Sequence, residues 1–172
     1  PKDENELRRM MVTAVDHKGP VAIRYPRGTA EGIDLESSPE PIPLGTAEVL
    51  TRGDDLLILA IGHMVPPSLT AHRLLKEQGI ESTVVNCACV KPMDADTITR
   101  LARAIPRIVT VEENALQGGF GSAVLELLAD HGVGAVTVKR LGIPDHFIEH
   151  GSASVLRKKY GLDAESIVQT AR

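Results

Sequence analysis

Four short aliphatic runs, separated by longer segments, constrain the fold of this chain more than any other feature. The runs are Leu56–Ile61, Ser82–Cys89, Ile108–Val111 and Ala135–Lys139. Their apolar and β-branched residues are typical of strands that are buried on both faces of a sheet. Parallel strands need a crossover of a dozen or more residues, and the segments between the runs have this length. The pattern therefore predicts an α/β fold with a mostly parallel sheet flanked by helices.

The segments around these strands carry helix start and stop signals. Helices are predicted over 66–78, 95–104, 122–130, 153–160 and 164–170. Asp94 and Asp163 stand immediately before two of them, where an Asp side chain accepts hydrogen bonds from the free backbone amides. A further short strand is predicted over Thr46–Leu50.

The first 43 residues follow a different pattern. Asp3 and Glu6 form a capping pattern for a helix whose apolar positions run from Leu7 to Val15. Val21–Tyr25 is predicted to be a short strand. One helix and one strand cannot form a core, so we expect this piece to dock on another part of a protein. The stretch 28–43 ends in a Pro-rich run and is predicted to be a linker that marks a domain boundary.

Composition excludes several classes of function. The formal net charge is -4, no run of Lys or Arg is present, and only 2% of the residues are aromatic, all of which disfavour nucleic-acid binding. No apolar stretch approaches the ~20 residues that span a bilayer. The start Pro1-Lys2-Asp3-Glu4 resembles neither a signal nor a transit peptide. It also lacks an initiator Met, so we expect the chain to be processed or excised from a longer protein.

The chain has two cysteines, Cys87 and Cys89. Residues two apart on a strand are too close in sequence for an ordinary disulfide, which favours a reducing, cytosolic compartment. Two cysteines alone leave a zinc ion short of ligands. We therefore interpret both as small, buried, apolar side chains.

The best candidate for ligand binding is the stretch Arg24-Tyr25-Pro26-Arg27-Gly28. Arginine suits phosphate because its planar guanidinium donates two parallel hydrogen bonds. Arg27 leaves the predicted strand just beyond a proline, where its side chain can reach a ligand. Arg24 lies on the strand itself, where pairing with a carboxylate is the alternative. We therefore assign phosphate binding to Arg27 and consider Arg24 the weaker candidate for the same role.

The stretch His146-Phe147-Ile148-Glu149-His150 matches the His-x-x-Glu-His pattern of inverted zinc peptidases. That chemistry needs both histidines on one helical face and a third ligand. Pro144 before the motif and Gly151 after it leave barely a turn and a half for a helix. We interpret the match as a coincidence and predict no metal site in this chain.

Glu112 and Glu113 stand at the carboxyl end of a predicted strand, where they could form a general acid/base pair. Neighbours on a strand point to opposite faces, so the two carboxylates cannot act on one bond. A role in helix capping or at a subunit interface is favoured instead.

Glycines follow the same strand in Gly118-Gly119-Phe120-Gly121-Ser122. Their amides could cradle an anion at the start of the next helix. The stretch matches neither the dinucleotide fingerprint nor the nucleotide-binding loop, and close packing of helix on strand is favoured.

Two further positions lie near predicted strand ends. His63 follows the strand Leu56–Ile61, at the edge where open α/β sheets bind ligands, although a turn residue is the simpler interpretation. Lys91-Pro92-Met93-Asp94 is predicted to be a turn followed by a helix cap. On residue chemistry alone, the chain has no catalytic residue, no cofactor loop and one anion-binding arginine.

Several stretches together resemble the C-terminal part of the 1-deoxy-D-xylulose-5-phosphate synthase family, which belongs to the transketolase superfamily. They are Ala22–Gly28, Val90–Asp94, Val109–Asn114, Gly118–Ser122, Leu141–Asp145 and Phe147–Gly151. The Glu-Glu stretch with its glycines is shared across the superfamily. The Arg-Tyr-Pro-Arg-Gly and Gly-Ile-Pro-Asp stretches narrow the resemblance to the synthase.

This resemblance implies a transferase that condenses pyruvate with glyceraldehyde 3-phosphate and releases carbon dioxide. The family uses thiamine diphosphate and magnesium, supplies isoprenoid, thiamine and pyridoxal synthesis, and is a homodimeric, cytoplasmic bacterial enzyme. Residues 1–30 would be the tail of the pyrimidine-binding domain, 31–43 a linker, and 44–172 the transketolase-type C-terminal domain. In the family, the second Arg of Arg-Tyr-Pro-Arg-Gly contacts the substrate phosphate, and here that residue is Arg27.

The sequence also departs from the family pattern. The Gly-Asp-Gly…Asn motif for magnesium and diphosphate is absent, as is the Glu that activates the cofactor. Ala88-Cys89 stands where the family usually carries Arg-Phe, which weakens anion binding by that loop. We therefore expect an inactive fragment that binds no thiamine diphosphate. Two alternatives stay open: the C-terminal domain of another superfamily enzyme, and a free-standing binding or assembly module.

Overall fold

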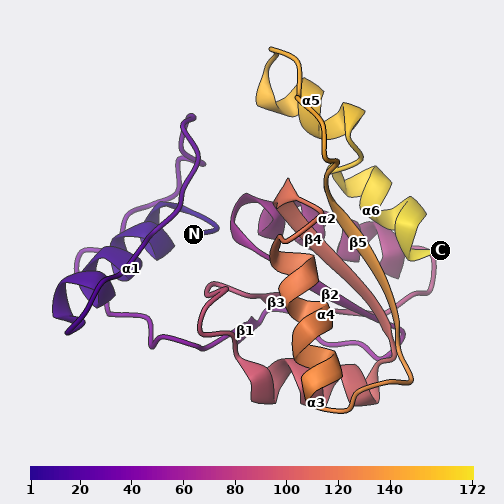
Figure 1. The fold of residues 1–172 in the computed structure, drawn as a ribbon. Coiled ribbons are helices and arrows are strands. Elements are labelled where there is room, and N and C mark those ends of the chain that lie inside the picture. Colours follow the sequence, from indigo (N-terminus) through magenta and orange to yellow (C-terminus); the bar gives the residue numbers. More distant parts are fainter.

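A five-stranded sheet forms the centre of the structure, a computed structural model that describes residues 1–172 (Figure 1). The strands are β1 (Glu48–Val49), β2 (Leu56–Ala60), β3 (Ser82–Asn86), β4 (Arg107–Ala115) and β5 (Thr137–Ile143). Their order is β1-β3-β2-β4-β5; β1 is antiparallel to β3, and all other pairs are parallel. The predicted mostly parallel α/β sheet is confirmed.

Helices cover both faces of this sheet. On one face lie α2 (Val65–Lys76) and α6 (Ala164–Ala171), and on the other α3 (Ala95–Ala104) and α4 (Phe120–Asp130). The remaining helices are α1 (Glu4–Asp16), η1 (Gly62–Met64, a 3₁₀ turn) and α5 (Ala153–Lys159). Side chains alternate along β2, so that Leu56 and Ile58 pack against α2 and α6. Leu57 and Leu59 pack against α3 and α4 on the other face. This burial on both faces explains why β2 carries no polar residue.

The predicted helices agree with the structure to within a few residues at their ends. The side chain of Asp94 accepts from Thr97 N at 3.0 Å, and that of Asp163 accepts from Ser166 N at 2.9 Å, as predicted for caps. Strand ends differ more. The structure extends β4 through Glu112 and Glu113 to Ala115, because β5 continues beside it as a pairing partner.

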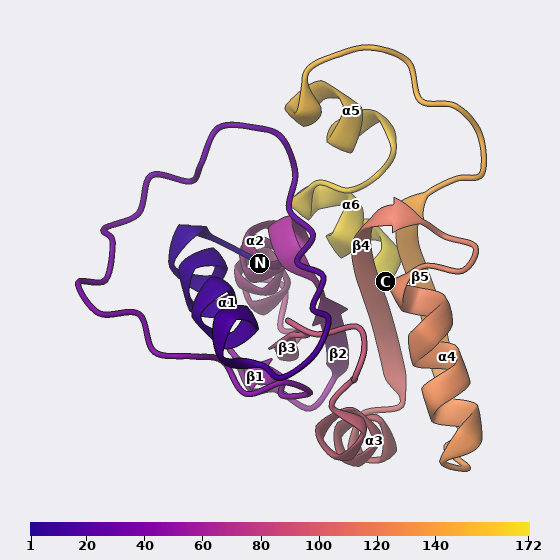
Figure 2. The same cartoon turned by 60° about the vertical axis from the view of Figure 1, so that its left-hand side comes forward.

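The N-terminal part lies beside the sheet domain rather than within it (Figure 2). Asp3 caps α1 as predicted, because its carboxylate accepts from Glu6 N at 2.7 Å. The prediction of a strand over Val21–Tyr25 is wrong: this stretch is neither helix nor strand, and most of it is exposed. A strand needs a hydrogen-bonded neighbour, and the sheet pairs none of its five strands with these residues. No helix in residues 1–172 is both long enough and apolar enough to cross a bilayer.

Candidate functional site

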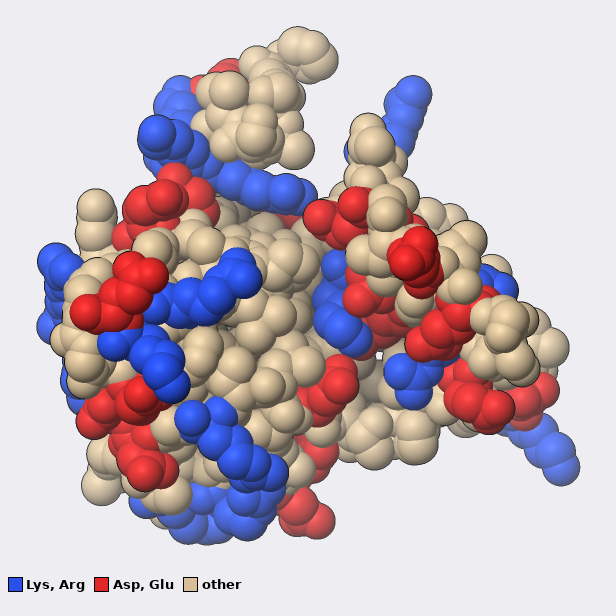
Figure 3. Space-filling view, turned by 180° about the vertical axis from the view of Figure 1, so that it is seen from behind, with Lys and Arg blue, Asp and Glu red and all other residues tan.

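A cavity of about 740 Å³ separates the N-terminal part from the sheet domain. Seen from behind, a cleft divides the larger sheet domain from a smaller body on which acidic side chains gather (Figure 3). The walls carry both apolar side chains, such as Met10, Ile23 and Ile61, and charged ones. Such a mixture of apolar walls with a few polar groups is typical of small-molecule sites.

The sheet domain contributes the ends of three neighbouring strands to this cavity. Ile61–His63 follow β2, Ala88–Pro92 follow β3, and Glu113 and Asn114 lie near the end of β4. All three strands are parallel, so their carboxyl ends meet at one edge of the sheet. Ligands of open α/β sheets bind at this edge. The structure thus places His63 at this ligand-binding edge, as the sequence predicts.

The opposite wall comes from α1 and from the stretch that follows it. Residues 20–26 run along the cavity, and Arg24 is among its lining residues. Arg27 is exposed and does not line the cavity. The structure therefore brings the weaker candidate, Arg24, to the strand-end edge, together with Lys91. The role of Arg27 stays a prediction.

Glu112 does not face the cavity but caps α4. Its carboxylate accepts from Phe120 N at 2.6 Å and from Gly121 N at 2.7 Å, and the residue is fully buried. Burial raises the pKa of Glu112, although the two amides and the charges of Arg140 and Arg24 oppose this shift. The predicted role in helix capping is confirmed.

The glycines at the start of α4 serve close packing, as predicted. A Cβ atom on Gly119 would lie 2.1 Å from Ala115 O and 2.3 Å from the carboxylate of Glu112. At Gly121 a Cβ would lie 2.6 Å from Thr110 Oγ1. Because Glu112 occupies the amides at the start of α4, they are not free to cradle an external anion.

Glu113 points away from Glu112, as expected for neighbours on a strand. It forms an ion pair with Arg157 of α5, with 2.9 Å between Arg157 Nε and Glu113 Oε1. The same guanidinium lies 3.2 Å from His63 Nδ1. Sequence reasoning missed this cluster because Arg157 lies 44 positions from Glu113 and 94 from His63.

The His-x-x-Glu-His stretch lies in a loop without helix, so its histidines cannot share a helical face. Glu149 is engaged elsewhere, because Lys159 and Tyr160 both donate to its carboxylate. These hydrogen bonds, first that of Lys159, lower the pKa of Glu149 to about 2. The residues around this motif give it a local structural role.

The two cysteines have different environments. Cys87 is buried at the end of β3, and burial raises the pKa of its thiol, in agreement with its interpretation as an apolar side chain. Cys89 is half-buried and lines the cavity, which the sequence analysis did not predict. The chain bends at residues 90–92, and the predicted helix cap at Asp94 is confirmed. Asp94 also accepts from Ala47 N at 2.9 Å.

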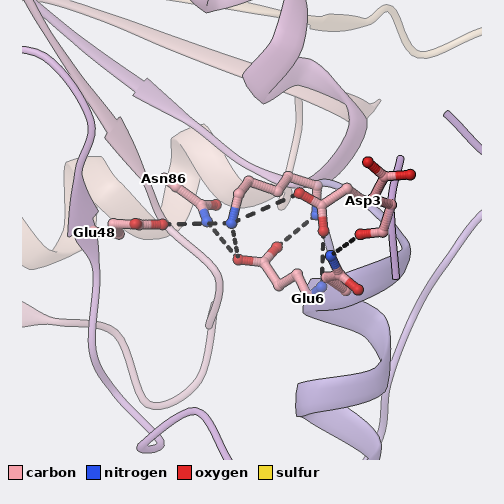
Figure 4. Close-up of polar contacts among 7 residues, drawn as sticks. Asp3, Glu6, Glu48 and Asn86 are labelled. Carbon is pink, nitrogen blue, oxygen red and sulfur yellow. Dashed lines mark hydrogen bonds and ion pairs between the residues drawn. The ribbon is translucent and has the colours of Figure 1, made fainter. Parts of the chain in front are cut away.

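A buried polar network fixes α1 to the sheet (Figure 4). Glu6, only 3% exposed, accepts from Asn86 Nδ2 at the end of β3 at 2.5 Å. Lys2 donates to Glu6 and to Glu48 of β1. No sequence pattern predicts this contact, because Glu6 and Asn86 are 80 positions apart.

Replacing Asn86 with Asp should detach α1 from the sheet domain, because two carboxylates would then face each other in a buried position. We expect amide hydrogen exchange in α1 to become about tenfold faster, since a buried hydrogen bond to a charged group contributes ~1.5–3 kcal/mol. Asn5→Ala is the matched control: Asn5 lies on the same helix but bonds only to Asp34 and Glu36 of the linker. Unchanged exchange in the Asn86→Asp chain would contradict the anchoring role.

Comparison with protein families and curated sequences agrees with this architecture. The family model described as "Transketolase, C-terminal domain" matches residues 45–167. A 1-deoxy-D-xylulose-5-phosphate synthase 1 of Geobacter sulfurreducens is 58% identical over 97% of the chain, which covers 26% of that protein. The synthase of Desulforudis audaxviator is 52% identical over 99% of the chain, which covers 27% of it. The chain thus spans about a quarter of the length of these curated relatives.

Solved structures give the same result at the level of the fold. A structure titled "Split gene transketolase, inactive beta4 tetramer" matches 99% of the chain and 55% of its own chain, with a TM-score of 0.86 and 33% identity. A transketolase from Leishmania mexicana matches 74% of the chain with a TM-score of 0.55 and 24% identity, a likeness of fold alone. Nearly the whole chain, α1 included, therefore has a structural counterpart.

Proposed function

Because the chain belongs to the transketolase C-terminal domain family and matches 1-deoxy-D-xylulose-5-phosphate synthases over nearly its whole length, we propose that it is the C-terminal part of such a synthase. The resemblance expected from its motifs is confirmed. In this proposal, residues 1–30 are the tail of the pyrimidine-binding domain, 31–43 the linker, and 44–172 the C-terminal domain. The complete enzyme is a homodimeric, cytoplasmic transferase that serves isoprenoid, thiamine and pyridoxal synthesis.

The reaction joins two small molecules. Pyruvate loses its carboxylate as carbon dioxide, its C2 forms a bond with the aldehyde carbon of glyceraldehyde 3-phosphate, and the resulting alkoxide takes up a proton. The product is 1-deoxy-D-xylulose 5-phosphate. The acceptor aldehyde must be held in place by its phosphate, since binding energy from the non-reacting part of a substrate orients the reacting part.

The match to the synthases over nearly the whole chain carries this proposal, and the cavity at the strand ends supports it. The cavity places Arg24 and Lys91 at the edge of the sheet where α/β folds bind ligands. Arg27 follows Arg24 by three positions and lies outside the cavity. We assign the phosphate contact to Arg27 in the complete enzyme, and a supporting role in the cavity wall to Arg24.

Magnesium and thiamine diphosphate supply a carbanion equivalent in this enzyme family, but the residues of this chain do not fit them. No three His, Cys, Asp or Glu side chains converge in residues 1–172. The amides at the start of α4, which could have held a diphosphate, are bonded to Glu112. We therefore assign the cofactor to other parts of the complete enzyme and no catalytic residue to this chain.

The chain by itself should form no 1-deoxy-D-xylulose 5-phosphate from pyruvate and glyceraldehyde 3-phosphate, even with thiamine diphosphate and magnesium added. The reason is that it offers no donor set for either. Product is measured by mass spectrometry, with the full-length synthase of Geobacter sulfurreducens as the positive control. Product above the no-protein blank, or saturable binding of thiamine diphosphate in calorimetry, would refute the proposed division of roles.

A further inference from the structure

Arg157 connects helix α5 to two residues of the cavity wall. Its Nε and Nη2 atoms donate to Glu113 Oε1 at 2.9 Å and Oε2 at 3.1 Å, a bidentate arrangement. Its Nη2 also lies 3.2 Å from His63 Nδ1. Glu113 and His63 line the cavity, while Arg157 does not. The guanidinium thus lies behind the wall and orders two side chains that form it.

Helix α5 reaches the strand-end edge through the side chain of Arg157. Helix α5 stands above the sheet and has no buried residue (Figure 1). The hydrogen bonds from Arg157 to Glu113 and His63 are the only side-chain hydrogen bonds between α5 and the strand-end edge. A pairing of this kind on an otherwise exposed helix orients the partner side chains more than it stabilises the core.

The geometry determines the tautomer of His63. A guanidinium has only N–H donors, so an Arg157–His63 hydrogen bond requires Nδ1 to accept. An imidazole that accepts at Nδ1 carries its proton on Nε2. Glu113 accepts two N–H groups of Arg157 and so keeps the guanidinium in the orientation that His63 requires. His63 therefore has a defined donor, its Nε2–H.

This donor is available to a ligand. No residue of the chain forms a hydrogen bond with His63 Nε2, and the ring lines the cavity. Arg24 and Lys91 bring positive charge to the same cavity, against the single carboxylate of Glu113, which Arg157 already neutralises. A neutral N–H donor in a cavity that also carries two cations suits an anionic oxygen.

We propose that His63 is a phosphate-binding residue that donates its Nε2–H to a phosphate oxygen, and that Arg157 is the positioning residue that fixes this tautomer. Glu113 in turn holds Arg157. The identity of the ligand as a phosphorylated aldehyde rests on the proposed function, whereas the tautomer and the binding of phosphate do not.

The first test measures the tautomer in the complete chain of 172 residues. Long-range ¹H–¹⁵N spectra at pH 8 are expected to show the Nε2–H form of His63. Arg157→Gln should return His63 to a mixture of tautomers, and Arg157→Lys should do so in part, since an ammonium keeps the charge but lacks the planar fork. An Nδ1–H tautomer in the unsubstituted chain, or no response to Arg157→Gln, would overturn the positioning role.

The second test measures binding of inorganic phosphate by the same spectra. Phosphate should shift the His63 Nε2 resonance, and His63→Asn should weaken phosphate binding about tenfold, since that amide cannot reach the place of Nε2. His63→Gln, whose longer side chain carries a donor to that place, should recover most of the affinity. His131→Asn, on the exposed end of α4, is the control for loss of a histidine.

Equal weakening by His63→Asn and His63→Gln would overturn the binding role, as would a response to pyruvate but not to phosphate. Failure of the proposed function is recognised separately. In that case phosphate still shifts His63, but glyceraldehyde 3-phosphate binds no more tightly than inorganic phosphate. The two proposals can therefore fail independently.

Discussion

Replacing Glu112 with Ala is expected to lower the free energy of unfolding of the chain by about 3 kcal/mol at pH 7. The substitution leaves the amides of Phe120 and Gly121 buried without an acceptor, and each such loss costs ~1–3 kcal/mol. It also removes the cap of α4, whose residues Phe120, Val124 and Leu128 fill one face of the core. Against a total stability of ~5–15 kcal/mol for a domain, this loss is large.

Urea unfolding followed by circular dichroism measures this effect. Glu112→Gln should cost less, because its amide oxygen still accepts one of the two hydrogen bonds. Glu126→Ala, an exposed Glu on the same helix, is the matched control and should change the stability by less than about 0.5 kcal/mol. A similar loss in the Glu112 and Glu126 variants would show that Glu112 does not act as the cap.

The carboxyl of Glu112 also makes the stability of the chain depend on pH in a defined direction. Burial raises the pKa of Glu112 above its ordinary value of 4.5, so the folded state binds this proton more tightly than the unfolded state. The stability that this group contributes is fully present below its unfolded pKa and decreases as the pH rises through the folded pKa. The difference in stability between the unsubstituted chain and Glu112→Ala should therefore widen as the pH falls from 7 toward 4.5. A constant difference would contradict the raised pKa.

Replacing Arg27 with Ala in a full-length synthase that contains this chain is expected to raise KM for glyceraldehyde 3-phosphate roughly 10–100-fold. The loss of a charge-assisted hydrogen bond to phosphate corresponds to ~1.5–3 kcal/mol. KM for pyruvate should change little, because pyruvate has no phosphate. Steady-state kinetics with each substrate varied in turn measure both constants. An equal rise in both KM values would contradict the assignment of the phosphate contact to Arg27.

Two further variants sharpen this experiment. Arg27→Lys should recover only part of the affinity, since a point charge lacks the fork that binds two phosphate oxygens. Arg24→Ala separates the two arginines, because Arg24 lines the cavity and Arg27 does not. A larger rise of KM in Arg24→Ala than in Arg27→Ala would move the phosphate contact to Arg24.

Local sequence patterns predicted much of the fold because they depend on near neighbours. The apolar run at Leu56–Ile61 became β2, buried on both faces, and Asp94 caps α3 as its position indicates. The opposite directions of Glu112 and Glu113 follow from the period of a strand, and the structure agrees. Such features need only residues a few positions apart, so they can be read without knowing the tertiary structure.

The errors lie where a residue depends on a distant partner. Val21–Tyr25 has the composition of a strand but no strand beside it, so it remains irregular. The structure brings Arg24 to the cavity, which no local pattern indicates, while the phosphate contact of Arg27 stays a prediction. Hydrogen bonds to a partner strand and the walls of a cavity both come from segments far apart in the chain, and no local pattern encodes them.

The sequence by itself determined the α/β class, most helix and strand positions, the helix caps and the family resemblance, because all of these rest on local periodicity or on contiguous motifs. Only the tertiary structure decided that Glu6 meets Asn86 and that Arg157 meets His63 and Glu113. These contacts join residues 44 to 94 positions apart. They exist because the parallel sheet gathers the carboxyl ends of β2, β3 and β4 at one edge, where α1 and α5 then reach them.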